Sequence, residues 1–486
     1  MAKTSSILDN YPEYELTIGI EVHVQLTTAS KIFCSCPNQV GIKPNTNICN
    51  ICTAQPGALP VLNKKVVEYA IKAGLATDSI IAPHSTFARK HYFYPDLPKN
   101  YQISQSDEPI CSAGIIPIRL EDGGIKKVRL TRIHIEEDAG KNIHSEQENS
   151  SFVDLNRTGT PLLEIVSEPD ISSTYEAKAY LRALRLIVQY LGICSGNMEE
   201  GAFRADTNIS VRKKGAQKLG TRCELKNINS FKFIGDAIEY EIERQIELLE
   251  SGQKVRQETR LWDTKNKKSI LMRSKEEAAD YRYFQDPDLP ILQISQSMIE
   301  QEKQSMPELP FDRFQRYTTQ NGLTPNETEI IVEDVELATY YEQALQINPS
   351  KLIINWILRD LMGYLKEHKI PLSEVKMTPA ALAALVSLVE TGIINNRAAQ
   401  EVFAIVCQTG QSPQAIVKEK GLEQIGSSQE LEVMVKELLD ASPAQVADYK
   451  AGKEKMFGFF VGQMMQKTKG KGDPKIISEL LKKYLS

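Results

Sequence analysis

The sequence predicts an α+β fold in which an antiparallel sheet is followed by an all-helical C-terminal half. At residues 16–26, β-branched and leucine residues alternate with Gly, Glu, His and Gln, which is the pattern of a half-buried strand. Near residue 290 the pattern changes, and apolar residues then recur with helical spacing. Strand-like runs with a polar face recur before that change, at 128–137, 161–166, 198–212 and 220–231. A sheet with one face reserved for a ligand follows from these runs.

Composition and length describe an ordinary globular protein. The chain has 486 residues, of which 41% are hydrophobic and 25% are charged. This length suggests about three domains, and we expect an α+β domain at 1–292, a helical domain at 293–409 and a small helical tail at 410–486. No apolar run approaches the ~18 residues that span a bilayer. The N-terminus lacks the apolar core of a signal peptide, so we expect a cytoplasmic protein.

The first strand pattern carries an acid and a histidine on its polar face. Glu21 and His23 are two residues apart, so their Cα atoms lie roughly 7 Å apart on one face of a strand. Both side chains can therefore converge on one ion. The alternative is a polar stripe that faces solvent on a half-buried sheet.

A carboxylate also lies inside the apolar run at 161–166. Leucine, isoleucine and valine flank Glu164, so its side chain should be shielded from water. Burying an unpaired ionised carboxylate costs on the order of several kcal/mol. Glu164 is therefore expected to be protonated, paired with a cation such as Arg132 or Arg157, or bound to a metal.

Three more acids, Glu136, Glu137 and Asp138, end the strand pattern at 128–137 or follow it. Hard oxygen ligands clustered in this way suit Mg²⁺, which is often shared with a nucleotide phosphate. Two acid-bearing strands that face each other favour a metal site more strongly than either strand alone. A salt-bridged or surface position for these acids is the alternative.

Four cysteines crowd into a short, turn-rich segment. Cys34, Cys36, Cys49 and Cys52 give the spacing C-x-C-x12-C-x2-C, with two short chelating pairs. Such pairs suit a tetrahedral Zn²⁺ site, and four thiolates leave no open position for a substrate. We expect structural zinc; free thiols and an iron–sulfur site remain the alternatives.

Basic and aromatic residues interleave at 87–105, where Arg89 and Lys90 precede three aromatic residues. This mixture can hold phosphates and stack a base. An irregular loop whose aromatic side chains pack into the core explains it equally well. Arg204, on the polar face of the run at 198–212, is a further candidate for a phosphate contact.

Helical patterns separate the strands of the N-terminal part. Residues 63–76 have an amphipathic pattern that begins at the capping residue Asn63. A second helix is expected after a capping box formed by Ser173 and Glu176, ending at Gly192. A third runs from about Ser230 to Gly252. We expect these helices to support the fold and to carry no functional site.

The C-terminal half consists of amphipathic helices, expected at 350–368, 379–406, 428–440 and 474–485. The net charge of −5 is uneven, because residues 448–486 carry nine lysines against four acids. Lys467 and Lys469, next to flexible glycines, can contact a nucleic-acid backbone without reading its sequence. A solvated lysine-rich helix face is the alternative.

Several segments are specific enough to carry a family resemblance. They are YELTIGIEVHVQL, ARKHYFYPDLPKNYQISQ, RIHIEEDAGK, VDLNRTGTPLLEIVSEPD, MEEGAFRADTNIS, ELKNINSF, DYRYF and the C-terminal run GKEKMFGFFVGQMMQKTKGKGDPKIISELL. With these segments the chain resembles the B subunit of the tRNA-dependent amidotransferases along nearly its whole length.

The resemblance implies a glutamine-synthetase-like catalytic domain and a C-terminal helical part that binds tRNA. It implies a heterotrimer with an amidase, the A subunit, which releases ammonia, and with a small C subunit. The B subunit would use ATP to phosphorylate the side-chain carboxylate of Glu-tRNA(Gln) or Asp-tRNA(Asn), and ammonia would displace the phosphate. The family's magnesium ligands fall on Glu21, His23, Glu137 and Glu164, and the presence of all four cysteines implies zinc.

Two other functions remain open at the level of sequence. One is a zinc-containing tRNA-binding scaffold in a complex whose chemistry lies elsewhere. The other is a small-molecule carboxylate–amine ligase of the glutamine-synthetase type, against which the basic tail argues. For the ATP-dependent function, Arg89, Lys90 and Arg204 are the candidate phosphate-holding residues.

Overall fold

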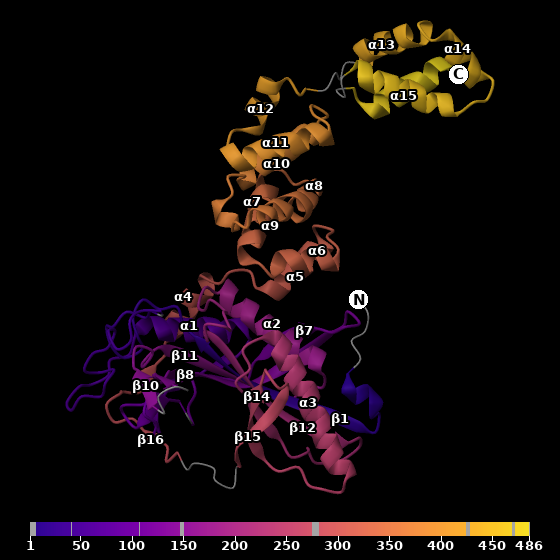
Figure 1. The fold of residues 1–486 in the computed structure, drawn as a ribbon. Coiled ribbons are helices and arrows are strands. Elements are labelled where there is room, and N and C mark those ends of the chain that lie inside the picture. The colour runs from indigo at the N-terminus through magenta and orange to yellow at the C-terminus, as the bar shows by residue number, and fades with distance from the viewer. Residues whose placement is uncertain are drawn as a thin grey trace. The chain divides into compact units, whose positions relative to one another are not determined.

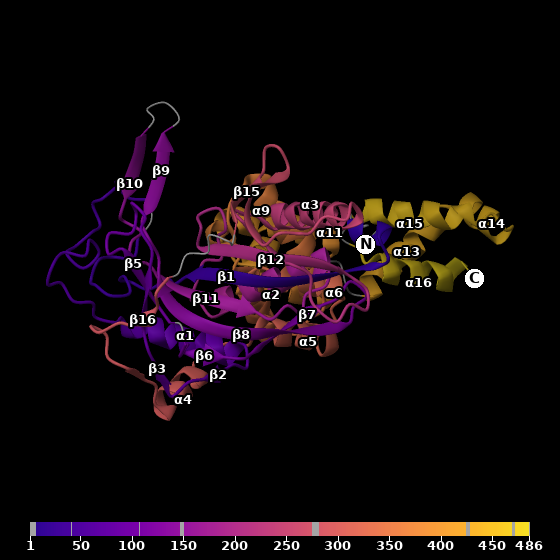
Figure 2. The ribbon, with the colours of Figure 1, turned by 90° about the horizontal axis from the view of Figure 1, so that it is seen from below.

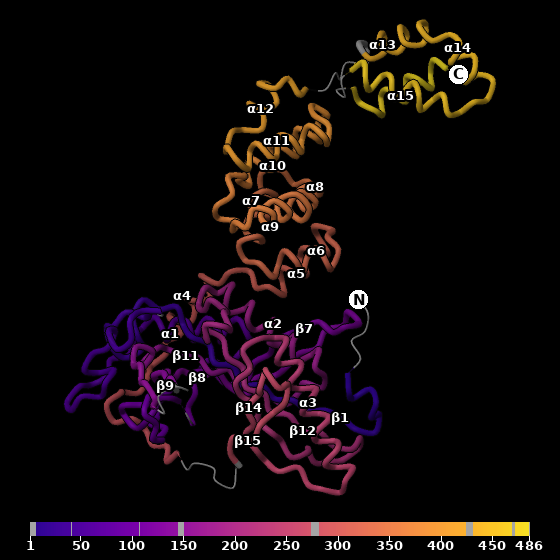
Figure 3. The backbone as a smooth tube through the Cα atoms, viewed as in Figure 1, coloured from indigo at the N-terminus to yellow at the C-terminus, as the bar shows by residue number. Residues whose placement is uncertain are grey.

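The computed structural model describes residues 6–39, 41–105, 107–145, 150–274, 281–423, 428–468 and 472–485. The chain divides into two compact units, Met1–Arg313 and Phe314–Ser486 (Figures 1 and 3). An α+β N-terminal part followed by a helical half confirms the predicted fold class. The finer division at residues 292 and 409 stays a prediction.

A ten-stranded sheet organises the first unit. Its strand order is β15-β14-β13-β12-β1-β11-β8-β6-β2, with β7 paired to β8 beside this path. The strands are β1 (Tyr14–Gln25), β2 (Ile80–Ile81), β6 (Cys111–Ser112), β7 (Ile115–Arg119), β8 (Ile125–Glu137), β11 (Pro161–Ser167), β12 (Phe203–Lys213), β13 (Cys223–Lys226), β14 (Glu258–Asp263) and β15 (Lys268–Ser274). Figure 2 shows β12, β1, β11 and β8 side by side.

One strand pair departs from the predicted antiparallel arrangement. β13 and β14 are parallel, whereas the other pairs of this sheet are antiparallel. The helix α3 (Phe231–Glu250) lies between these two strands in the chain. A helical crossover returns the chain to the same edge and produces a parallel pair. The sheet is therefore mixed.

Three helices pack on the apolar face of this sheet. They are α1 (Lys64–Ala76), α2 (Thr174–Tyr190) and α3, and their buried residues join those of β1 in one core. The caps of α1 and α2 follow the sequence prediction. The Asn63 side chain accepts a hydrogen bond from the Lys65 N–H, and the Ser173 hydroxyl accepts one from the Glu176 N–H. The Glu176 carboxylate accepts from the Ser172 N–H instead of closing a box on Ser173.

Strand β1 explains why the opposite face of the sheet is polar. Its residues alternate between buried and half-buried along all twelve positions, as the sequence predicts. Ile18, Ile20, Val22 and Val24 lie in the core. Glu21 and His23 therefore lie on the other face, which we call the ligand face.

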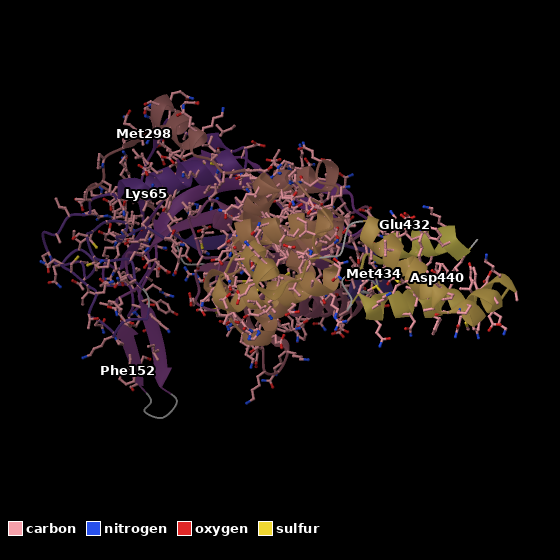
Figure 4. The ribbon with its side chains drawn as sticks, turned by 90° about the horizontal axis from the view of Figure 1, so that it is seen from above. Lys65, Phe152, Met298, Glu432, Met434 and Asp440 are labelled. Carbon is pink, nitrogen blue, oxygen red and sulfur yellow. The ribbon has the colours of Figure 1, made fainter. Side chains whose placement is uncertain are left out.

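Smaller elements surround the sheet. They are η1 (Ile7–Asn10), a three-stranded sheet of β4 (Ala88–His91), β5 (Tyr101–Ser104) and β16 (Phe284–Gln285), the pair β3 (His84–Ser85) and β17 (Leu292–Gln293), and the hairpin β9 (Lys141–Ser145) and β10 (Ser150–Asp154). Phe152, labelled in Figure 4, lies on that hairpin opposite Ile143. Helix α4 (Gln296–Gln304) is joined to α1 by an ion pair of Lys72 and Glu302 at 3.5 Å.

The second unit is built from short helices. After α5 (Pro310–Thr319), which crosses the boundary, they are α6 (Pro325–Val332), α7 (Val335–Ile347), α8 (Leu352–Asn355), the π-helical turn η3 (Trp356–Leu361), α9 (Met362–His368), η4 (Leu372–Glu374), α10 (Pro379–Glu390), α11 (Asn396–Thr409), α12 (Pro413–Lys420), α13 (Ser428–Asp440), α14 (Pro443–Lys450), α15 (Lys455–Lys467) and α16 (Pro474–Leu485). The last four share their own core, which includes Leu431, Phe460 and Leu481. Among the described residues, no helix has the length and apolarity to cross a bilayer.

Candidate metal-binding active site

The strand register brings two histidines and two acids together on the ligand face. His23 of β1 lies opposite Glu164 of β11, and Glu164 lies opposite His134 of β8. Directly opposed residues on neighbouring strands share a face of the sheet. Glu136 lies two residues beyond His134 on the same strand and therefore on the same face. The four side chains form one cluster.

The distances within this cluster suit a shared ion. The His23 Nε2 atom lies 3.3 Å from Glu136 Oε1 and 3.4 Å from Glu164 Oε2. One ligand atom from each of these three residues lies within 4.8 Å of the others. The acids are buried, with Glu136 2% and Glu164 8% exposed. Two carboxylates and an imidazole at this spacing can hold a divalent cation.

The electrostatics show how the acids stay ionised despite burial. Burial raises the pKa of Glu136 and Glu164, but the two histidines outweigh it, lowering the pKa of Glu136 to about 2 and that of Glu164 well below its usual range. Burial lowers the pKa of His23, yet hydrogen bonds to both carboxylates raise it to about 10. The two ionised carboxylates thus favour a positive charge next to them. Either a proton on His23 or a divalent cation can supply that charge.

His134 orients the carboxylates from the inner side of the cluster. Its Nε2 atom lies 3.3 Å from Glu164 Oε2, and the Arg132 Nε–H donates to its Nδ1 at 3.3 Å. Because a guanidinium can only donate, Nδ1 accepts and Nε2 carries the proton. Burial lowers the pKa of His134, but Glu164 and Glu136 outweigh burial and raise it. His134 was not among the residues predicted from the sequence, although its place in RIHIEED puts it on the face of Glu136.

The structure places the other two predicted ligands differently. Glu21 lies beside the cluster, where burial and the charge of Glu164 raise its pKa, and its carboxylate accepts from Asn208 Nδ2 at 3.4 Å. Glu137 is on the opposite face of β8 from Glu136. Its carboxylate pairs with Lys99 and accepts from the Ile103 N–H at 2.9 Å. The structure does not bring Glu137 to the cluster, because strand alternation turns it toward β5.

Arg89 and Lys90, both predicted to hold phosphates, have surroundings that differ from each other. Arg89 forms ion pairs with Asp286 at 2.7 Å and Asp288 at 2.8 Å, so its guanidinium holds the β16 segment against β4. Lys90 is half-buried near the cluster. Burial lowers its pKa, but the charges of Glu136 and Glu164 outweigh burial and the pKa is raised. Lys90 therefore stays cationic beside the two acids.

Arg204 lies opposite His23 in the β1–β12 register. Its Nη2 donates to Asp138 Oδ2 at 3.0 Å, while its buried Nε has no hydrogen-bond partner among the described residues. In the second unit, Lys467 pairs with Glu437 at 2.7 Å. Lys469 lies outside the described residues.

The four predicted cysteines converge. Cys52 Sγ lies 3.4 Å from Cys34, 3.7 Å from Cys49 and 3.8 Å from Cys36, and none of the four forms a disulfide. The Lys31 ammonium, which is 1% exposed, lies 3.5 Å from Cys52 Sγ. The hydrogen bond from Cys34 and the charge of Lys31 hold the pKa of Cys52 below its usual range. The cluster has the ligands and spacing of a structural metal site.

Two family models match this chain, one in each unit. Residues 16–300 match the model of the GatB/GatE catalytic domain, and residues 339–485 match that of the GatB domain. The chain belongs to the family of aspartyl/glutamyl-tRNA amidotransferase B subunits. Membership confirms the resemblance seen in the sequence motifs.

Members of this family resemble the chain over nearly their full length. Proteins named as the B subunit of aspartyl/glutamyl-tRNA(Asn/Gln) amidotransferase are 50% identical in Thermodesulfovibrio yellowstonii (97% of this chain and 99% of the relative) and 52% identical in Geotalea uraniireducens (98% and 100%). The Geobacter sulfurreducens protein of the same name is 52% identical over 97% of this chain and 99% of its own length.

His134→Ala should weaken divalent-cation binding, because it removes the donor that orients Glu164. We expect the Kd for Mn²⁺, measured by electron paramagnetic resonance, to rise about 10–100-fold, the range for loss of an orienting group. His134→Gln can still donate to Glu164 and should restore much of the affinity. An unchanged Kd in a folded His134→Ala protein would contradict the positioning role.

We expect the cysteine cluster to bind zinc, which the metal content of the protein tests. Elemental analysis of the purified protein should find about one zinc per chain, lost on Cys49→Ser. Cys407→Ser, which changes a buried cysteine elsewhere, should retain the metal. A wild-type protein that is zinc-free and fully stable would contradict a structural zinc site.

Proposed function

We propose that the chain is the ATP-dependent component of a tRNA amidotransferase that converts Glu-tRNA(Gln), Asp-tRNA(Asn) or both to the amidated forms. Family membership and the names of its relatives support this proposal. The observation that carries the chemistry is the cluster of His23, Glu136 and Glu164 on the ligand face. The enzyme would be a carbon–nitrogen ligase that takes its nitrogen from glutamine through a partner.

The residues of the cluster fit magnesium. Carboxylate oxygens are the ligands that Mg²⁺ prefers, and an imidazole is tolerated beside them. We propose that His23, Glu136 and Glu164 are the magnesium ligands and that Glu21 lies next to them. Glu136 thus takes the role that the family resemblance implied for Glu137. When bound, the ion would neutralise phosphate charge during phosphoryl transfer.

The chain's own residues would position the reacting groups. His134 holds Glu164 in place, and Lys90 supplies a fixed cation near the acids for a phosphate or a substrate carboxylate. The substrate carboxylate attacks the γ-phosphorus of ATP and ADP leaves, which gives an acyl phosphate. Ammonia then attacks the acyl carbon and phosphate leaves. Arg204, which lies opposite His23, would contact a phosphate, whereas Arg89 is engaged by two aspartates.

The remaining parts of the chain have supporting roles in this proposal. The four cysteines would hold a structural zinc, with the buried Lys31 offsetting the excess negative charge of four thiolates. Residues 410–486 would form a domain that contacts the tRNA backbone through lysines such as Lys467. Ammonia would come from an amidase, the A subunit, in a heterotrimer that also holds a small C subunit.

Glu136→Gln should abolish amidation in the assembled complex without affecting the partner. We expect the rate of amide formation from ammonium, ATP and misacylated tRNA to fall at least ~100-fold, since a charged metal ligand is lost. The glutaminase rate of the partner should not change. Glu176→Gln, which alters a helix-capping carboxylate on α2, is the matched control.

A normal amidation rate in Glu136→Gln would overturn the metal assignment. A wild-type complex that amidates without consuming ATP would overturn the proposed reaction and favour the scaffold alternative. Assays with both misacylated tRNAs decide which tRNA is the substrate.

A further inference from the structure

The chain between the two cysteine pairs is hydrogen-bonded to the chain that leads into β11. We call residues 41–48 the intercysteine segment and residues 155–160 the β11 leader. Asn45 Nδ2 donates to the Val153 carbonyl at 2.8 Å, and the Leu155 N–H donates to Asn45 Oδ1 at 2.8 Å. Asn45 thus joins the intercysteine segment to the start of the β11 leader.

Asn156 makes the buried part of this connection. It is 7% exposed, and its Oδ1 accepts from the Asn47 N–H at 2.8 Å while its Nδ2 donates to the Lys43 carbonyl at 2.7 Å. The Asn47 carbonyl in turn accepts from the Lys31 ammonium at 3.0 Å, and this ammonium also contacts Cys52 Sγ. A continuous series of hydrogen bonds therefore runs from Asn156 to the cysteine cluster.

The far end of the β11 leader is hydrogen-bonded to the residue that follows β8. The Gly159 N–H donates to the Asp138 carbonyl at 3.0 Å, and the Asp138 N–H donates to the Thr160 carbonyl at 2.8 Å. The Gly159 carbonyl accepts from the Ile32 N–H at 2.9 Å. Gly159 has a φ of 77°, which glycine adopts readily, and in this conformation it bonds both to Asp138 and to the cysteine region.

Asp138 collects donors from three parts of the first unit. It is 6% exposed, and its Oδ2 accepts from Gln25 Nε2 and from Arg204 Nη2, each at 3.0 Å. The Nε of Arg157, in the β11 leader, lies 3.6 Å from the same oxygen. Since Arg204 lies opposite His23 on β12, the Asp138 carboxylate fixes a guanidinium on the ligand face next to the metal cluster.

We propose that the cysteine cluster positions the active site, with Asn156 as the connecting residue and Asp138 as the residue that fixes Arg204. When the cysteines hold a metal, the intercysteine segment orders the β11 leader, and the leader orders Asp138. Arg204 is then held ready for a phosphate. This inference rests on the proposed function for the role of Arg204, whereas the connection itself depends only on the hydrogen bonds.

A cysteine cluster that stabilises only its own turns is the alternative. The contacts of Asn156 argue against it, because Asn47 and Lys43 lie 109 and 113 residues away from Asn156 in the chain. Hydrogen bonds between such distant segments order both of them at once. Binding of a metal by one segment therefore contributes to the folding of the other.

The first test compares Asn156→Ala with the wild type in the full complex with its partner subunits. Zinc should stay at about one per chain, since all four cysteines remain. We expect amide hydrogens of the β11 leader and of Asp138 to exchange at least ~10-fold faster. The KM for ATP should rise about tenfold, as on loss of an outer-shell partner. The Kd for Mn²⁺ should stay within about twofold, because the metal ligands are unchanged.

Ser230→Ala is the matched control. It removes the hydrogen bond at the N-cap of α3, in the same unit, and has no contact with the β11 leader among the described residues. Its exchange rates at residues 155–160 and its KM for ATP should equal those of the wild type. A general loss of stability would affect both variants.

Removal of zinc from the wild-type complex with the chelator dipicolinate gives a second test that does not depend on how a variant folds. The same amides should exchange faster without zinc, those of α3 should not, and added zinc should restore the original rates.

Unchanged exchange in the β11 leader after zinc removal would overturn the inference. An unchanged KM for ATP in zinc-loaded Asn156→Ala, or loss of zinc from this variant, would overturn it as well. Failure of the wild-type complex to show ATP-dependent amidation would instead overturn the proposed function, and the exchange results would still decide whether the connection exists.

Discussion

Two carboxylates buried on neighbouring strands are the constraint on which the rest of the first unit depends. Glu136 and Glu164 are almost inaccessible to solvent and lie around one imidazole. Removing an ionised carboxylate from water costs on the order of several kcal/mol unless positive charge is supplied. His23, whose pKa is raised to about 10, supplies it in the protein alone, and a divalent cation satisfies the same requirement.

The sheet makes this arrangement possible by keeping its two faces distinct. Isoleucine and valine side chains of β1 fill the core beneath α2 and α3, and that packing fixes the register of β1 against β11 and β12. A shift by one residue would turn His23 and Glu164 into the core and expose the apolar residues. The same register places Asp206 opposite Glu21 on the ligand face, where Asp206 pairs with Lys226 of β13. Stability and function thus use the same alternation of residues.

Sequence alternation was sufficient for much of the site and insufficient for some of it. Alternation predicted the common face of Glu21 and His23. The apolar neighbours of Glu164 predicted its shielding, and the spacing of the four cysteines predicted their convergence. The choice between Glu136 and Glu137 also depended on alternation, since Ile133 and Ile135 turn Glu137 to the core face, but the family resemblance pointed to Glu137. His134 was missed because the ligand set implied by the family resemblance does not include it.

Other features depended on contacts between distant segments. The pairing of Arg89 with Asp286 joins residues far apart in the chain, and no local pattern indicates it. The parallel pair β13–β14 follows from the path of α3 over the sheet, whereas the sequence suggested an antiparallel arrangement.

The most direct test of a metal ion shared by His23, Glu136 and Glu164 is a crystal of the protein grown with Mn²⁺ and measured at the manganese absorption edge. We expect an anomalous peak between His23 Nε2 and the carboxylates of Glu136 and Glu164, at about 2.0–2.3 Å from each. A peak bound instead by Glu137, or no peak on the ligand face at saturating Mn²⁺, would contradict it.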